Sequence, residues 1–127
     1  MNATAAADEV ADLRHQRRDL RRELARVKWW RRLIAARRDL TLASLTVPDT
    51  VAQDATEAAW LALASDAPTA LELTGAVWPD VHEVTVADLD ALDALDARLD
   101  RYEGRLSATL DNVTAQMVDA MGKVHRA

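Results

Sequence analysis

Three arginines interrupt the apolar seam of a heptad pattern in the first third of this sequence of 127 residues. One position of the repeat is occupied, in order, by Val10, Arg17, Leu24, Arg31, Arg38 and Leu45. A guanidinium group carries five N–H donors and is costly to bury without an acceptor. We therefore expect each of these arginines to meet a carboxylate, to extend its head group into solvent, or to hold an anionic ligand.

The seam arginines are expected to lie on one long helix over residues 8–45. Neither Gly nor Pro occurs in this segment. The other seam position holds, at intervals of seven, Leu13, Leu20, Val27 and Ile34. Such a helix would be roughly 55 Å long, and Pro48 should follow its end because proline cannot continue the helical hydrogen bonds. An amphipathic rod of this length needs another helix beside it.

A second long helix is expected over residues 86–122. Thr85 and Asp88 resemble a capping box in which Asp takes the place of the usual Glu, and Gly122 is expected to end the helix. An apolar stripe in steps of three or four, with one step of seven, consists of Leu89, Leu92, Leu95, Leu99, Tyr102, Leu106, Leu110, Val113, Met117 and Val124. The matching lengths of the two segments predict an antiparallel pair.

The connector over residues 46–84 is less regular. Residues 51–64 indicate a short helix, and the rest of the connector is interrupted by Pro68 and by the stretch 75–79. Three Gly and three Pro in the whole chain leave few tight turns for a many-stranded fold. The sequence therefore predicts an all-α fold, a single helical domain whose two long helices form an antiparallel coiled-coil hairpin, with one or two short helices in the connector.

The charges are sorted along the chain, although the formal net charge is only −5. Residues 1–45 contain 11 basic and 6 acidic side chains, whereas residues 46–127 contain 5 basic and 15 acidic ones. In one interpretation the seam arginines pair with the aspartates of the second helix, and in the other a charged surface serves a partner. The aspartates concerned are Asp90, Asp93, Asp96 and Asp100. Because two helices alone bury little, a dimer mate or another protein is expected as partner.

Residues 28–40, KWWRRLIAARRDL, resemble part of the first helix of the RsiG-like anti-sigma factors of actinobacteria. Members of that family are antiparallel helical hairpins that hold a sigma factor of the sporulation or flagellar type inactive, many of them when loaded with cyclic di-GMP. The resemblance implies a regulator of transcription whose partner is a sigma factor. It also implies cyclic di-GMP as a candidate ligand.

The ligand motif of that family runs Glu, Ser, Arg, Gln, Asp in steps of four, three, four and four, along one face of a helix. The resemblance places its Arg on Arg31 and its Asp on Asp39, which suit the acceptor and donor edges of guanine. The other positions depart from the motif, since Leu24 replaces Glu, Lys28 replaces Ser and Ala35 replaces Gln. Lys28 could still meet a phosphate, so the candidate nucleotide-binding residues are Lys28, Arg31 and Asp39.

Trp29 and Trp30 are the candidate partner-binding residues, together with Arg38. Neighbouring side chains on a helix point about 100° apart, so the two indole rings are not expected to share the seam. We expect one ring to lie in the core and the other to be an exposed anchor, either for a groove on a partner or for stacking on a base.

Other functions fit these residues less well. The three histidines are scattered, no cysteine is present and no serine lies in a nucleophile elbow, which argues against an enzyme and against a metal site. A chorismate-mutase-like enzyme, to which LIAARRDLTLASL is loosely similar, would need cationic residues that residues 46–97 lack. Direct nucleic-acid binding is opposed by the net acidity. A helical scaffold protein without a nucleotide ligand, and a homodimer, stay open as alternatives.

The sequence also bears on location. No apolar run approaches the roughly 20 residues of a membrane span, and the opening MNATAAADEV lacks the basic start of a signal peptide. We therefore expect a soluble cytoplasmic protein without a membrane partner. Together these patterns predict a non-enzymatic, anti-sigma-like regulator that sequesters a sigma factor through its hairpin, with cyclic di-GMP as a candidate modulator.

Overall fold

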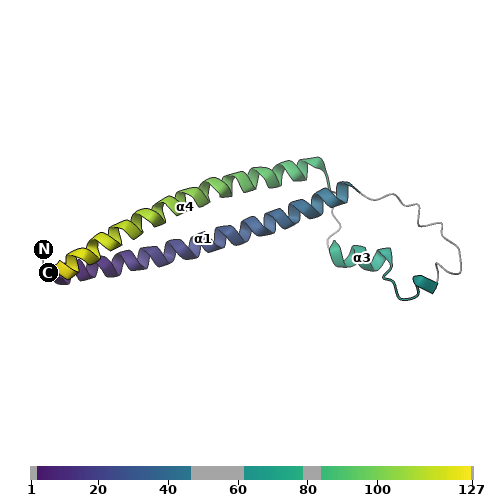
Figure 1. The fold of residues 1–127 in the computed structure, drawn as a ribbon. Helices are drawn as coiled ribbons and strands as arrows, with labels where there is room; N and C mark the ends of the chain where they lie inside the picture. Colours follow the sequence, from purple (N-terminus) through teal and green to yellow (C-terminus); the bar gives the residue numbers. More distant parts are fainter. Residues whose placement is uncertain (1–2, 47–61, 79–83, 127) are drawn as a thin grey trace.

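The computed structural model describes residues 3–46, 62–78 and 84–126. Its helices are α1 (Ala3–Leu45), α3 (Ala70–Val77) and α4 (Val86–Arg126). No strand occurs within these described ranges. Figure 1 shows α1 and α4 lying side by side along their length, with the two chain ends together and the connector at the opposite end. The predicted all-α fold, with two long helices packed as an antiparallel hairpin, is confirmed.

Both long helices extend beyond their predicted ends. α1 begins five residues before the predicted start because Ala3–Ala7 is rich in alanine, the strongest helix former. α4 continues through Gly122 to Arg126, so the prediction that Gly122 ends the helix is wrong. Gly122 does not adopt a positive φ, and the basic residues Lys123 and Arg126 beyond it suit the negative end of the helix dipole.

Short side-chain caps begin α4 and α3. The backbone N–H of Thr85 donates to Oδ2 of Asp88 at 2.8 Å, which is the part of the predicted capping box contributed by the acid. Before α3, the backbone N–H of Glu72 donates to Oγ1 of Thr69 at 3.2 Å, and the Thr69 hydroxyl donates to the Glu72 carboxylate. Each cap satisfies an N–H group that the first turn of the helix leaves free.

The core between α1 and α4 is a narrow row of side chains. Its main cluster, near the end where the termini meet, consists of Val10, Leu13, Val113 and Ala120, with Leu20, Met117, Met121 and Val124 packed against it. Farther toward the connector, the buried residues are Val27, Thr41 and Leu106. The hydroxyl of Thr41 donates to the backbone carbonyl of Arg37 at 2.8 Å. Apolar packing is thus concentrated at the terminal end of the hairpin.

α3 is the short helix described in the connector, and it does not pack against α1 or α4. Its Leu71 is 83% exposed and its Leu73 is exposed as well. Most of the short helix predicted at residues 51–64 lies outside the described residues. In the parts of the chain that the structure describes, no helix combines the length and the apolar character needed to cross a membrane.

Candidate functional site

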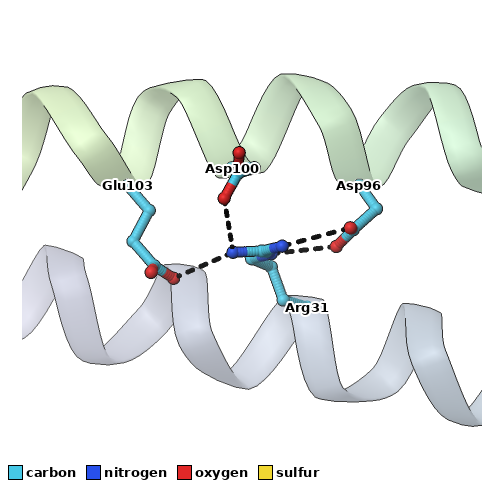
Figure 2. A network of polar contacts seen from close by, with 4 residues as sticks. All are labelled: Arg31, Asp96, Asp100 and Glu103. Atoms are coloured by element: carbon cyan, nitrogen blue, oxygen red, sulfur yellow. Dashed lines mark hydrogen bonds and ion pairs between the residues drawn. The ribbon is translucent and has the colours of Figure 1, made fainter.

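Arg31 lies at the centre of a network of ion pairs across the seam (Figure 2). Its Nε and Nη2 atoms donate to Oδ1 and Oδ2 of Asp96 at 2.9 and 3.1 Å. Its Nη1 atom donates to Oδ1 of Asp100 at 3.1 Å, and Oε1 of Glu103 lies 3.6 Å from the same nitrogen. All three guanidinium nitrogens therefore face carboxylates of α4.

The network favours the charged forms of Arg31 and Asp96. The hydrogen bonds to Asp96, with smaller contributions from the charges of Asp100 and Glu103, raise the pKa of Arg31 above its ordinary value. The same hydrogen bonds lower the pKa of Asp96, although partial burial opposes this shift. The Arg31 side chain, which is 27% exposed, is thus neutralised within the hairpin. The pairing interpretation of the sequence holds at this residue.

The other two seam arginines also reach oxygen atoms of α4. Nε of Arg38 donates to Oδ1 of Asp93 at 2.6 Å, and Nε of Arg17 donates to Oγ1 of Thr114 at 3.1 Å. Arg17 and Arg38 are 21 positions apart on α1, and their partners Thr114 and Asp93 are also 21 positions apart on α4, which is a spacing of three heptads on each helix. Of the four aspartates predicted to pair with arginines, three do so, and Asp90 forms no ion pair within the described residues.

Lys28 and Asp39 lie away from this network. Both are exposed on α1, and neither side chain forms a hydrogen bond or ion pair with any residue that the structure describes. Asp39 follows Arg31 by eight residues, about 12 Å along the helix axis. The three candidate nucleotide-binding residues are therefore divided, with Arg31 directed toward the carboxylates of α4 and the other two at the surface.

Trp29 and Trp30 are both at the surface, 46% and 44% exposed. Their rings meet edge to face, with centroids 4.7 Å apart and planes at 66°. The expectation that one ring lies in the core is wrong, because Val27 and Arg31 occupy the seam positions on either side. Leu33, also exposed, comes four residues after Trp29 and three after Trp30, so all three side chains lie close together on the helix. We call Trp29, Trp30 and Leu33 the tryptophan patch.

An open groove runs between α1 and α4 beside the seam. One part of it has a volume of about 680 Å³, with an apolar lining of Val27, Trp30, Ile34, Leu95, Leu99 and Tyr102. Four arginines complete this lining, namely Arg26, Arg98, Arg101 and Arg105. A second part of about 650 Å³ shares Arg26 and Tyr102 and continues toward the termini past Asp19, Leu20 and Glu23. We call the two parts together the interhelix groove.

Glu23 links the two helices at the middle of the interhelix groove. Its carboxylate accepts hydrogen bonds from Nη2 and Nε of Arg26 at 2.6 and 3.1 Å, and from the hydroxyl of Tyr102 at 3.2 Å. The bonds from Arg26 first, and then the bond from Tyr102, hold the pKa of Glu23 below its ordinary value. Partial burial, and then the bond to Glu23, raise the pKa of Tyr102 above 10.0. The Arg105 guanidinium lies 5.8 Å from the centre of the Tyr102 ring, within cation–π range.

A basic strip occupies α1 nearer to the termini. A hollow of about 480 Å³ is lined there by Arg14, Arg17, Arg18, Arg21 and Arg22, with Ala25 and Met117. Among these arginines, Arg17 alone forms a side-chain hydrogen bond with the described part of the chain. The basic helix therefore meets acidic residues at Arg31 and Arg38 but leaves this strip without carboxylate partners among the residues that the structure describes.

No protein-family model, curated protein or solved structure matches the chain. Across residues 3–46, 62–78 and 84–126, no group of three or more metal-binding side chains is placed to hold a metal ion. The described surfaces offer apolar and cationic contact, which suits the binding of another molecule.

The interhelix groove was not predicted from the sequence. Its signal was present, because Arg98, Arg101 and Arg105 follow one another in steps of three and four and therefore share one side of α4, with Tyr102 among them. The apolar stripe predicts a core position for Tyr102, whereas the heptad and stripe patterns say nothing about the arginines beside it. A basic row beside an apolar stripe is the pattern that would have indicated the groove.

Proposed function

We propose that this protein is an anti-sigma-like regulator that binds a sigma factor through its helical hairpin and keeps it from RNA polymerase. The observation that carries the proposal is the tryptophan patch, an exposed cluster of large apolar side chains on α1. Exposed tryptophans on a rigid helix are typical anchors of protein interfaces. The likeness of residues 28–40 to RsiG-like anti-sigma factors supports a sigma factor as the partner.

The uneven core of the hairpin supports a role in binding. The main apolar cluster lies near the termini, whereas the connector half has fewer buried side chains and carries the ion pairs of Arg31 and Arg38. Partly exposed ion pairs contribute little stability each, about 0–1 kcal/mol. A partner packed along this end would cover the tryptophan patch and supply apolar burial that two helices alone do not provide.

The acidic half of α4 supports the same kind of partner. Asp93 and Asp100 remain half or more exposed even while they bind arginines, and Asp90 is exposed on the same helix. A sigma factor has basic surfaces where it meets promoter DNA. An acidic face can compete for such surfaces because complementary potentials speed encounter and select the partner.

Binding to purified sigma factors of the sporulation and flagellar types tests the proposal. We expect co-elution in size-exclusion chromatography and inhibition of transcription from a promoter that depends on the bound sigma factor. The double variant Trp29→Ala/Trp30→Ala should bind at least about tenfold more weakly. Leu71→Ala on α3 is the matched control, since it removes an exposed apolar side chain away from the hairpin. Failure of the folded protein to bind any of these sigma factors would overturn the proposal.

The Arg31 network favours a regulator that works without a bound nucleotide. Cyclic di-GMP at Arg31 would have to compete with Asp96 for the guanidinium fork. We therefore expect no saturable change in tryptophan fluorescence when cyclic di-GMP is added to the protein, alone or with its partner. Saturable binding that is lost in Arg31→Ala would instead support modulation by the nucleotide, as the resemblance implies.

A further inference from the structure

We propose that the interhelix groove receives an acidic amphipathic helix of a partner protein. This inference rests on the proposed function in taking a protein as partner, and it adds the place on the hairpin and the kind of element that docks there. Two antiparallel helices with an open apolar channel between them lack the third helix that would close a bundle. An amphipathic helix laid into such a channel is a recurrent mode of recognition.

The shape and lining of the groove suit a helix. Trp30 stands 44% exposed at its edge, next to Val27, which is almost completely buried. The lining runs from Gln16 to Ile34 on α1, a separation of 18 residue steps or about 27 Å along the axis. A partner helix of about 18 residues would therefore cover it, with apolar residues at intervals of three and four against the floor.

The charges at the connector half of the groove select an acidic helix. Arg98, Arg101 and Arg105 are exposed, and none of them forms an ion pair with a residue that the structure describes. Because they recur in steps of three and four, a partner helix with carboxylates in the same steps can meet them in register. The acid nearest to them in the groove, Glu23, is already bound by Arg26 and Tyr102.

A second copy of this chain fits the groove less well than another protein does. On α4, Asp93, Asp96 and Asp100 follow one another in steps of three and four, but all three are bound by arginines of α1. Releasing them would break the contacts that hold the connector end of the hairpin together. The exposed Asp90 and Asp111 lie 21 residues apart and form no such row, and α1 of a second copy, with 11 basic against 6 acidic side chains in residues 1–45, would be repelled by the groove arginines. Charge complementarity therefore indicates a different protein as the source of the acidic helix.

Two synthetic peptides test the inference on the full-length protein. One is an 18-residue helix with leucines spaced three and four apart and glutamates along one flank, and the other carries lysine at every glutamate position. Isothermal titration should show binding of the glutamate peptide at least about tenfold tighter than that of the lysine peptide, because like charges across an interface are strongly unfavourable. Trp30→Ala should weaken binding of the glutamate peptide by about tenfold or more.

Charge reversal in the groove supplies the decisive comparison. Arg98→Glu/Arg101→Glu should reverse the preference, so that the lysine peptide binds better than the glutamate peptide. Arg32→Glu/Arg37→Glu makes the same change in net charge at exposed positions of α1 outside the groove lining and should keep the original preference. Circular dichroism confirms that each variant is folded.

The possible outcomes separate this inference from the proposed function. Four outcomes would each overturn the inference that an acidic helix docks in the groove. They are equal binding of both peptides, binding of neither, no reversal of preference in Arg98→Glu/Arg101→Glu, and a stable dimer of the protein that occupies the groove. If Arg98→Glu/Arg101→Glu still binds the sigma factor, the groove is not the docking site, but the proposed function stands. If the protein binds the peptides with the expected preference but captures no sigma factor, the inference about the groove stands and the proposed function is overturned.

Discussion

Arg31 and Asp96 are joined by two parallel hydrogen bonds across the seam, at 2.9 and 3.1 Å. A planar fork of this kind restrains both the distance and the orientation of the two side chains, which a single contact does not. The pair occupies a seam position where a heptad pattern would otherwise place an apolar residue. We infer that the pair selects the register in which the acidic half of α4 meets α1. Apolar packing at this position is lost as a consequence.

A double-mutant cycle on Arg31 and Asp96 should show favourable coupling. We expect Arg31→Gln and Asp96→Asn, alone and combined, to give a coupling of about 1 kcal/mol in the free energy of unfolding, the upper range for partly exposed pairs. Chemical denaturation at low salt measures it. The coupling should shrink in about 1 M salt because the pair is partly exposed. A coupling of zero at low salt would show that the fork does not stabilise the hairpin.

Asp96 and Glu23 should make the hairpin sensitive to acid. Hydrogen bonds from arginine lower their folded-state pKa values below the ordinary 3.8 and 4.5. A carboxyl group whose pKa is lowered in the folded state stabilises the fold at pH values above its ordinary pKa. This contribution is lost as the pH falls through the folded-state pKa. We expect the melting temperature to fall as the pH drops below about 4.5, and Asp96→Asn to reduce that fall. Asp111→Asn, at an exposed position outside the network, should leave it unchanged.

Tyr102 offers a test at the opposite end of the pH scale. It is the single tyrosine of the chain, so its ionisation can be followed by ultraviolet absorbance. Its pKa is raised above 10.0 in the folded protein, by partial burial first and by the bond to Glu23 second. The raised pKa of Tyr102 stabilises the folded protein at pH values below the ordinary pKa. This contribution is lost as the pH rises through the folded-state pKa. Glu23→Gln should lower the pKa of Tyr102, and titration of the wild type at the ordinary value would contradict the placement of the ring.

The basic strip should destabilise the free protein at low salt. Arg18 has arginines three or four residues away at Arg14, Arg21 and Arg22, and like charges at such spacings are unfavourable by about 0.2–0.5 kcal/mol per pair. Arg18→Gln, which keeps helix propensity, should therefore raise the free energy of unfolding by about 0.5–1 kcal/mol at low salt. The gain should vanish at high salt. A gain that persists there would point to packing rather than charge.

Periodicity predicted the two long helices, because the heptads of α1 and the stripe of α4 depend on local spacing alone. Pairing of the seam arginines with aspartates of α4 was one of the interpretations that the sequence left open, and it holds for Arg31 and Arg38, whereas Arg17 donates to Thr114. Three features were missed or wrong: the position of both tryptophans at the surface, the run of α4 through Gly122, and the interhelix groove. The exposure of the tryptophans and the presence of the groove depend on which side of each helix faces the other. This is determined only when α1 and α4 pack together.

Gly104 should be a site where α4 can be stabilised by one methyl group. It lies in the middle of a helix of 41 residues without a positive φ, and a Cβ atom there would meet nothing within 4 Å. Gly104→Ala should raise the free energy of unfolding by about 0.5–1 kcal/mol because alanine loses less backbone freedom on folding. Gly75→Ala is the matched control, since its Cβ is equally unobstructed but α3 does not pack against the hairpin. It should leave hairpin unfolding unchanged. If Gly104→Ala stabilised the protein but weakened sigma-factor binding, the glycine would mark a close approach of the partner to α4.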